Sequence, residues 1–309
     1  MPGNVCCVCH IALDEPAKAI GGRFYCNIHY QRVTQDRRGI WLSTLLGILA
    51  LLIFVGLVAL IANTVQPALV GTPLVLVGFA LALVPALIWL GVFYQQDRLE
   101  AEPKRYVLGI SLLGAILALG LGIPVVRDLF RVQDWLNTAG PLVHLLGAIL
   151  VVGFAQEYLK YAGVRFTIFG SPEFDERVDG IIYGAAIGLG FATMLNAQYV
   201  VSYGGVQLGV GTIRIAVTAL AQASFAGVSG YFLGRAKFEE MPAWWLPAGV
   251  SLAAILNGTF TFLLQRVSMQ GLVFTPAYGL VLAAVMAGGT FGVLFALIQH
   301  VNATTLANL

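Results

Sequence analysis

The chain alternates between long apolar segments and short polar connections. A helix needs roughly 20 apolar residues to cross a bilayer, and eight segments qualify: about 40–62, 70–94, 107–124, 141–163, 179–203, 212–234, 243–265 and 276–300. The second is the least regular, because Pro67, Pro73 and Pro85 can shorten or kink a helix there. The pattern predicts an all-α fold, a polytopic bundle of about eight transmembrane helices.

Polar side chains lie inside two of these segments, in the stretch from Phe154 to Tyr203. Gln156, Glu157 and Lys160 fall in the fourth segment, and Asn196 falls in the fifth. Ionisable groups at membrane depth are costly and usually functional. We therefore expect the functional site in this stretch. Glu157 and Lys160 are three residues apart, so they share a helix face and can form a structural ion pair.

Small residues recur every four positions in the last four segments. The stripes are Gly180, Gly184, Gly188, Ala192 and Asn196; Gln222, Ala226, Gly230 and Gly234; Gly249, Ala253, Asn257 and Thr261; and, without an amide, Ala284, Gly288, Gly292 and Ala296. Residues four apart share a helix face, small residues allow close helix packing, and amides in lipid need partners. The simplest arrangement brings the three amides close to Gln156 and Glu157.

Composition and charge agree with a membrane protein. Hydrophobic residues make up 59% of the 309 and charged residues only 10%, against about 25% charged in soluble domains. With the N-terminus inside, only four of the 17 basic residues fall outside: Arg127, Arg131, Arg214 and Arg266. This bias predicts that both termini are cytoplasmic. The membrane we expect is a prokaryotic cytoplasmic membrane. The net charge of +2 indicates no nucleic-acid partner.

The N-terminal tail, residues 1–34, has a different character. It contains Cys6-x2-Cys9-x16-Cys26-x2-His29, a set suited to a tetrahedral structural Zn²⁺ site. A segment this short cannot bury a core of its own, so the metal would supply its folding energy. The spacing and the Phe-Tyr-Cys ending resemble one zinc knuckle of LIM-type or treble-clef fingers.

Other interpretations of the tail stay open. Cys7 could replace Cys6 or Cys9 as a ligand, and His10 is a further candidate. The alternative is a disordered tail with reactive thiols. Unpaired ligands of this kind fit a reducing cytoplasmic compartment better than a disulfide framework.

Four sequence motifs together resemble the PrsW family of intramembrane proteases. They are YQQDRLEAEPKRY, AQEYLKY, FDERVDGIIYGAAIGLGFATMLNAQY and SGYFLGRA. The resemblance covers most of residues 80–265, the core of a transmembrane bundle of residues 35–309. The tail of residues 1–34 and the first apolar segment would be additions to that core. The family is similar to the CAAX-protease and bacteriocin-processing membrane proteins, and it implies a multi-helix protease that cuts membrane-anchored substrates.

The family's site is written as a Glu-Glu-x-x-Lys motif, a Phe-x-x-x-Glu motif and histidines on two later helices. The first motif falls on Gln156, Glu157 and Lys160, so its first Glu is replaced. The second runs from Phe191 to Leu195, where Leu replaces the Glu. The chain thus departs from the pattern at two carboxylate positions.

The histidine positions fall on Gln222 and on Asn257, and Thr261 stands where an Asp or Asn would follow. Gln and Asn donate hydrogen bonds but cannot act as bases at neutral pH. Of the usual set, only Glu157 and Lys160 can exchange protons. One carboxylate with neutral amides is also a poor metal-ligand set, so we expect no metal in the membrane site. His144 is expected to be a hydrogen-bonding residue.

These substitutions favour a catalytically degenerate protease homologue, a pseudoprotease. Its polar residues would have a structural role and hold the bundle together. The bundle would bind a membrane-anchored protein or peptide, and the zinc tail would engage a cytoplasmic protein or a second copy of the chain. One alternative is an active intramembrane endopeptidase that uses Glu157, with Lys160 as an electrophile. The other is a transporter or channel for a small solute or ion.

Overall fold

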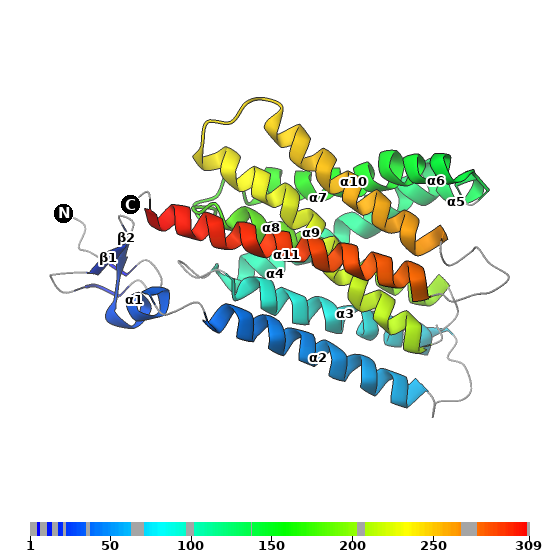
Figure 1. Cartoon of the computed structure of the whole chain (residues 1–309), viewed down its shortest axis with the longest axis horizontal. Coiled ribbons are helices and arrows are strands. Elements are labelled where there is room, and N and C mark those ends of the chain that lie inside the picture. Colours follow the sequence, from blue (N-terminus) through cyan, green and yellow to red (C-terminus); the bar gives the residue numbers. More distant parts are fainter. Residues whose placement is uncertain are drawn as a thin grey trace.

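The long apolar segments form helices, as their pattern predicts (Figure 1). The computed structural model describes residues 5–6, 11–13, 18–20, 23–34, 38–62, 71–96, 102–136, 138–202, 208–266 and 277–307. The bundle's helices are α2 (Arg38–Ala62), α3 (Thr72–Tyr94), α4 (Lys104–Leu117), α5 (Val132–Trp135), α6 (Pro141–Gly147), α7 (Phe154–Thr167), α8 (Asp179–Ser202), α9 (Leu208–Phe238), α10 (Trp245–Arg266) and α11 (Ala277–Ala307). Three π-helical turns interrupt them: η1 (Ala118–Gly122), η2 (Val125–Leu129) and η3 (Ala148–Gly153).

Within the described residues, seven helical stretches are long and apolar enough to cross a membrane. They are Thr72–Tyr94, Lys104–Trp135, Pro141–Thr167, Asp179–Ser202, Gly211–Phe238, Trp245–Leu264 and Leu280–Val301. They match the second to eighth predicted segments, so the polytopic α-helical membrane bundle is confirmed. In α2 the apolar stretch found is shorter, Leu42–Val58, and its role as a further span stays a prediction. α3 begins with Pro73 in its first turn and continues through Pro85.

α8 lies at the centre of the bundle, in contact with α3, α4, α7 and α9. Of its membrane span, 89% is buried, against 28% of the span in α11. Glycines make this burial possible. A Cβ on Gly184 would lie 2.5 Å from the carbonyl oxygen of Ala226, and one on Gly188 would lie 2.3 Å from that of Gln222. The small-residue stripes of α8 and α9 therefore pack backbone against backbone, as their spacing predicts.

The small-residue stripe of α11 is different. A Cβ on Gly288 or on Gly292 would meet no other atom within 4 Å, and both positions are exposed. This stripe faces away from the packed interior of the bundle.

The π-helical turn η3 sets the position of α7, which directly follows it. α10 packs against η3 through glycine: a Cβ on Gly258 would lie 2.3 Å from the Cα of Ile149, and one on Gly153 would lie 2.2 Å from the Ala254 carbonyl oxygen. A π turn widens the helix and changes the direction of the side chains that follow, and such turns are frequent at functional sites. The first residues of α7 thus face α10 at close range.

The N-terminal tail contains a small hairpin and a short helix. β1 (Lys18–Ile20) pairs antiparallel with β2 (Arg23–Tyr25), and α1 (Asn27–Thr34) follows. Cys7, Cys9 and His10 lie outside the described residues. α2 begins and α11 ends at the end of the bundle where the tail lies (Figure 1). This agrees with termini on one side of the membrane, and which side that is stays a prediction.

Candidate functional site

α7 carries the charged residues into the interior of the bundle. Glu157 and Lys160 are completely buried, and Gln156 is buried beside them. Lys160 Nζ lies 2.5 Å from Glu157 Oε1, so the ion pair predicted from their spacing is confirmed. Because both side chains have left water, neither charge is stable there without the other.

Lys160 has two further partners. Its Nζ donates to Gln222 Oε1 of α9 over 2.6 Å. The same nitrogen lies 5.4 Å from the ring centroid of Phe191 on α8, within the range of a cation–π interaction. Phe191 is the retained Phe of the second motif, and here it covers the buried ammonium.

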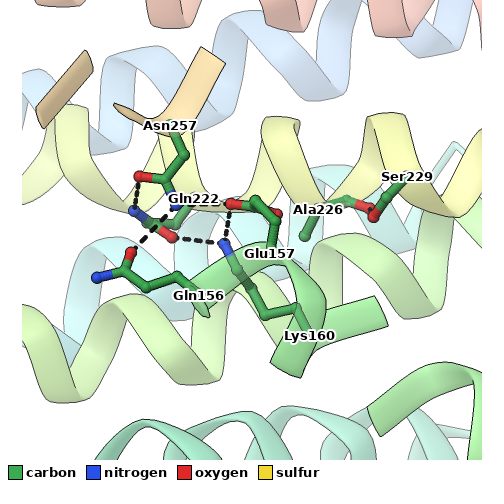
Figure 2. A network of polar contacts seen from close by, with 7 residues as sticks. All are labelled: Gln156, Glu157, Lys160, Gln222, Ala226, Ser229 and Asn257. Carbon is green, nitrogen blue, oxygen red and sulfur yellow. Dashed lines mark hydrogen bonds and ion pairs between the residues drawn. The ribbon is translucent and has the colours of Figure 1, made fainter. Parts of the chain in front are cut away.

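Amide groups from α9 and α10 complete the cluster (Figure 2). Gln222 Nε2 donates to Asn257 Oδ1 over 3.2 Å. Asn257 Nδ2 donates to Gln156 Oε1 over 3.1 Å and to Glu157 Oε1 over 2.7 Å. We call Gln156, Glu157, Lys160, Gln222 and Asn257 the bundle network. Three helices, α7, α9 and α10, contribute to it.

Asn196 does not join the bundle network, contrary to the expected meeting of all three amides. Its Nδ2 donates to the Ile215 carbonyl oxygen over 3.0 Å. Ile215 precedes Gln222 by seven residues on α9, which is about 10 Å along a helix. Asn196 therefore joins α8 to α9 at another level. His144 is buried against Phe262, with ring centroids 5.3 Å apart.

One oxygen of the bundle network stands out. Glu157 Oε2 is buried and has no hydrogen-bond partner among the residues that the structure describes. A buried carboxylate oxygen without a partner is costly. Its cost is offset in part because Oε1 receives both the Lys160 ammonium and the Asn257 amide.

The bundle network does not have the donor set of a catalytic metal site. Such sites use several imidazole, thiolate or carboxylate ligands around one open position. Here a single carboxylate is present, and the ammonium of Lys160 lies between its oxygen and that of Gln222. The oxygens of Gln156 and Asn257 already accept amide N–H groups.

A second buried polar group lies toward the start of α8, and the sequence analysis missed it. Tyr183 OH donates to Glu102 Oε2 over 2.5 Å. Asp179 Oδ2 accepts the backbone N–H groups of Asp175 and Glu176, at 2.7 and 2.5 Å. Asp179 and Tyr183 are four residues apart on one face of α8, a spacing that could have indicated the group. It fixes the connections before α4 and α8.

An ionic contact ties the α7–α8 connection to the end of α9. Arg177 Nε donates to Glu239 Oε1 over 2.8 Å, and Arg235 Nε donates to Glu239 Oε2 over 2.9 Å. The hydrogen bond from Arg235, helped by that from Arg177, holds the pKa of Glu239 below its usual value. The carboxylate thus stays ionised and joins two segments of the chain.

The tail brings three candidate metal ligands together. The ligand atoms of Cys6, Cys26 and His29 all lie within 4.8 Å of one another. His29 Nδ1 is 3.5 Å from Cys6 Sγ and 3.1 Å from Cys26 Sγ. Adjacent S and N ligands of a tetrahedral zinc ion are about 3.5 Å apart, given the usual Zn–S and Zn–N bond lengths. The three residues fit such an ion, and Cys9, the fourth predicted ligand, lies outside the described residues.

Comparison with known proteins identifies the bundle. A family model described as "PrsW family intramembrane metalloprotease" matches residues 102–289. A Protease PrsW of Halalkalibacterium halodurans is 31% identical over 202 residues, which cover 65% of this chain and 89% of the relative. One of Bacillus subtilis is 28% identical over 188 residues, covering 60% and 82%. No solved structure matches the chain. The family model spans more than half of the sequence, and the chain therefore belongs to the PrsW family.

Proposed function

We propose that this chain is a catalytically degenerate member of its family, which binds a membrane-anchored protein or peptide without cutting it. The observation that carries the proposal is the closed bundle network. Its two residues that can exchange protons, Glu157 and Lys160, are buried and paired with each other. The remaining members are neutral amides.

Hydrolysis of a peptide bond needs a base or a metal to activate water, and donors for the developing oxyanion. Each contribution is worth orders of magnitude in rate. Glu157 Oε1 is engaged by an ammonium and an amide, so this oxygen is not available to activate a water molecule. The metal that the family description names has no matching donor set in the bundle network. We therefore propose that the chain keeps the fold of a protease but lacks the groups that catalyse hydrolysis.

The retained scaffold supports a binding role. The close packing of α8 on α9 holds Gln222 opposite α7, and a contact of this kind needs small residues at fixed positions. Because this packing still holds the bundle network together, the bundle can bind a membrane segment beside it. The ligand class proposed is a single apolar helix of a membrane-anchored protein.

Turnover of membrane-anchored peptides tests the proposal. We expect the chain reconstituted in liposomes to release no cleavage product and Glu157→Gln to behave like the wild type. In the same liposomes, crosslinking should recover peptide bound to the wild type and peptide bound to Glu157→Gln. Cleavage by the wild type that is lost in Glu157→Gln would refute the proposal. The triple variant Gln156→Glu, Leu195→Glu, Gln222→His tests whether the scaffold can still support cleavage.

A second candidate is a peptidase that uses Glu157, and one observation favours it. The free oxygen, Glu157 Oε2, is an acceptor without a hydrogen bond among the described residues, so it could take a proton from water. This candidate predicts that Glu157→Gln removes cleavage and that Lys160→Met alters its pH dependence. The liposome assay separates the two candidates directly.

We propose that the tail binds one structural Zn²⁺ through Cys6, Cys26 and His29, with Cys9 as the fourth ligand. The spacing of the three described ligand atoms supports this set. The folded tail would contact a cytoplasmic protein or a second copy of the chain, with both termini in the cytoplasm. Metal analysis of the purified chain tests the zinc site, and a folded tail without metal would overturn it.

A further inference from the structure

Two buried carboxyl groups meet at the start of α8. Glu102 lies just before α4, and Asp179 is the first residue of α8; they are 4% and 1% exposed. The two side chains are hydrogen-bonded to each other, and Glu102 Oε2 also accepts the hydroxyl of Tyr183 over 2.5 Å. We call Glu102 and Asp179 the carboxyl pair. It joins the residues before α4 to the first turn of α8.

A hydrogen bond between two carboxyl groups requires a proton. An ionised carboxylate only accepts hydrogen bonds, and two negative charges at such a distance repel each other, so one of the two groups keeps its proton. The Tyr183 hydroxyl and the backbone N–H groups of Asp175 and Glu176 are donors to the pair. None of them supplies the proton of the bond between the two carboxyl groups. The carboxyl pair therefore shares one proton in the folded chain.

The described surroundings of the carboxyl pair are mostly acidic. The charged and titratable side chains around it are Tyr94 at the end of α3, Glu173, Asp175 and Glu176 in the α7–α8 connection, Tyr183 in α8 and Lys237 in α9. Lys237 is the basic member of this set, and its ammonium donates to the carbonyl oxygens of Phe169, Ser171 and Phe174. Loss of the shared proton would therefore place a second buried negative charge beside other acidic groups.

The carboxyl pair also fixes the α7–α8 connection, residues 168–178. Asp179 Oδ2 accepts the backbone N–H groups of Asp175 and Glu176 over 2.7 and 2.5 Å. The connection continues directly from α7, which carries Glu157 and Lys160. Repulsion within an ionised carboxyl pair would separate Asp179 from Glu102, and the connection and the end of α7 would move with Asp179.

We propose that the carboxyl pair is a pH-sensitive switch: its shared proton holds the α7–α8 connection at the start of α8, and loss of this proton releases the connection. Release is favoured as pH rises, because the closed form holds one proton that the open form, with ordinary carboxyl groups, gives up. The start of α8 lies on the predicted cytoplasmic side, so the switch would respond to cytoplasmic pH. The inference goes beyond the proposed function, and it holds whether the chain cuts a peptide or only binds one.

Hydrogen exchange of the full chain in detergent, measured by mass spectrometry and corrected for the intrinsic effect of pH, tests the proposal. In the wild type, protection of residues 168–178 should fall at least about tenfold between about pH 6 and about pH 9, since one proton changes the closing equilibrium by up to about tenfold per pH unit. Asp179→Asn should keep its protection at both pH values. Asn retains an oxygen for the backbone N–H groups and places an amide donor where the shared proton lies.

Two further variants complete the test. Glu102→Gln makes the same replacement in the other member of the pair and should also remove the pH dependence. Glu239→Gln is the matched control, because it breaks a hydrogen bond of Arg177 in the same connection and leaves the carboxyl pair intact. It should lower protection equally at both pH values and keep the wild-type pH dependence.

Four results would overturn the proposal. The first is wild-type protection of the connection that stays constant over this pH range. The second is wild-type pH dependence in a folded Asp179→Asn or Glu102→Gln variant. The third is failure of both variants to fold, because an amide must be able to replace the shared proton. The fourth is loss of the pH dependence in Glu239→Gln, since the titrating group would then lie in the ionic contact and not in the carboxyl pair.

Discussion

The bundle network and the tail cluster balance their charges in different ways. In the bundle network, the carboxylate of Glu157 meets an ammonium from the same helix, and both are completely buried. In the tail, two cysteines and a histidine converge with ligand atoms within 4.8 Å of one another. We propose that Zn²⁺ balances the charge there, because thiolates bind this ion strongly and it would supply the folding energy of so short a segment.

The difference shows where each cluster gets its stability. The bundle network is enclosed by helices that pack backbone against backbone, so its cation can be a side chain held in a fixed place. In the proposed zinc site, the tail would instead depend on a cation from outside. Changes to metal supply should therefore affect the tail, and changes to packing should affect the bundle network.

The largest expected effect is on the tail. His29→Ala should reduce bound zinc from one ion per chain to none, because a site with only three ligands left holds zinc weakly. The effect is large because a structural zinc site contributes about 10–16 kcal/mol of apparent binding free energy. The measurement is metal content together with protease sensitivity of the tail. Glu157→Gln is the control and should keep its zinc; loss of zinc from that variant would mean that the two clusters are not independent.

Breaking the buried pair should come next. Glu157→Ala leaves the Lys160 ammonium buried without a counter-charge and should cost about 3–5 kcal/mol of unfolding free energy. Glu157→Gln combined with Lys160→Met removes both charges and should cost less. Unfolding titrations in mixed micelles measure both. A double variant as unstable as the single one would show that the charges are not what stabilises the site.

Packing around the bundle network gives a smaller effect. Gly188→Ala would place a Cβ 2.3 Å from the Gln222 carbonyl oxygen, so α8 and α9 must separate at a cost of about 1–3 kcal/mol. Gly288→Ala on α11 is the matched control, because its Cβ would meet nothing within 4 Å. The same unfolding titrations should show this control to be neutral or slightly more stable. Equal losses in both variants would contradict the close packing of α8 on α9.

The smallest effect concerns Glu239, which lies outside both clusters. Its pKa is lowered in the folded chain by Arg235 and then Arg177, so its contribution is present above the ordinary Glu pKa of about 4.3. The contribution is lost as pH falls through the lowered folded value. Glu239→Gln should therefore cost up to about 1 kcal/mol at pH 7 and nothing below the folded pKa. A difference that grows on acidification would contradict this assignment.

The sequence predicted the helices and most of the bundle network for clear physical reasons. Apolar length defines membrane helices, and the i, i+3 spacing of Glu157 and Lys160 confines their pair to one face. The four-residue stripes correctly turned Gln222 and Asn257 toward α7. These features depend on local periodicity, which a sequence displays directly.

The errors of the sequence-based predictions concern two things. One is the level of a residue along its helix, and the other is contacts between segments that are distant in the sequence. Asn196 shares its stripe with Gly188 but hydrogen-bonds to Ile215, because a stripe gives the face of a helix and not its level against a neighbour. The contact of Glu102 with Tyr183 joins residues 81 positions apart. No local pattern relates the two, so it could be found only in the folded chain.

Metal content of the bundle tests the central claim most directly. The variant Cys6→Ser, Cys9→Ser, Cys26→Ser, His29→Ala removes all four proposed tail ligands, so any metal that remains bound belongs to the bundle. We predict that this variant, purified from metal-supplemented cells, carries no stoichiometric metal, because Lys160 already provides the cation at Glu157. A stoichiometric metal ion that is lost when Glu157→Gln is added would contradict the account.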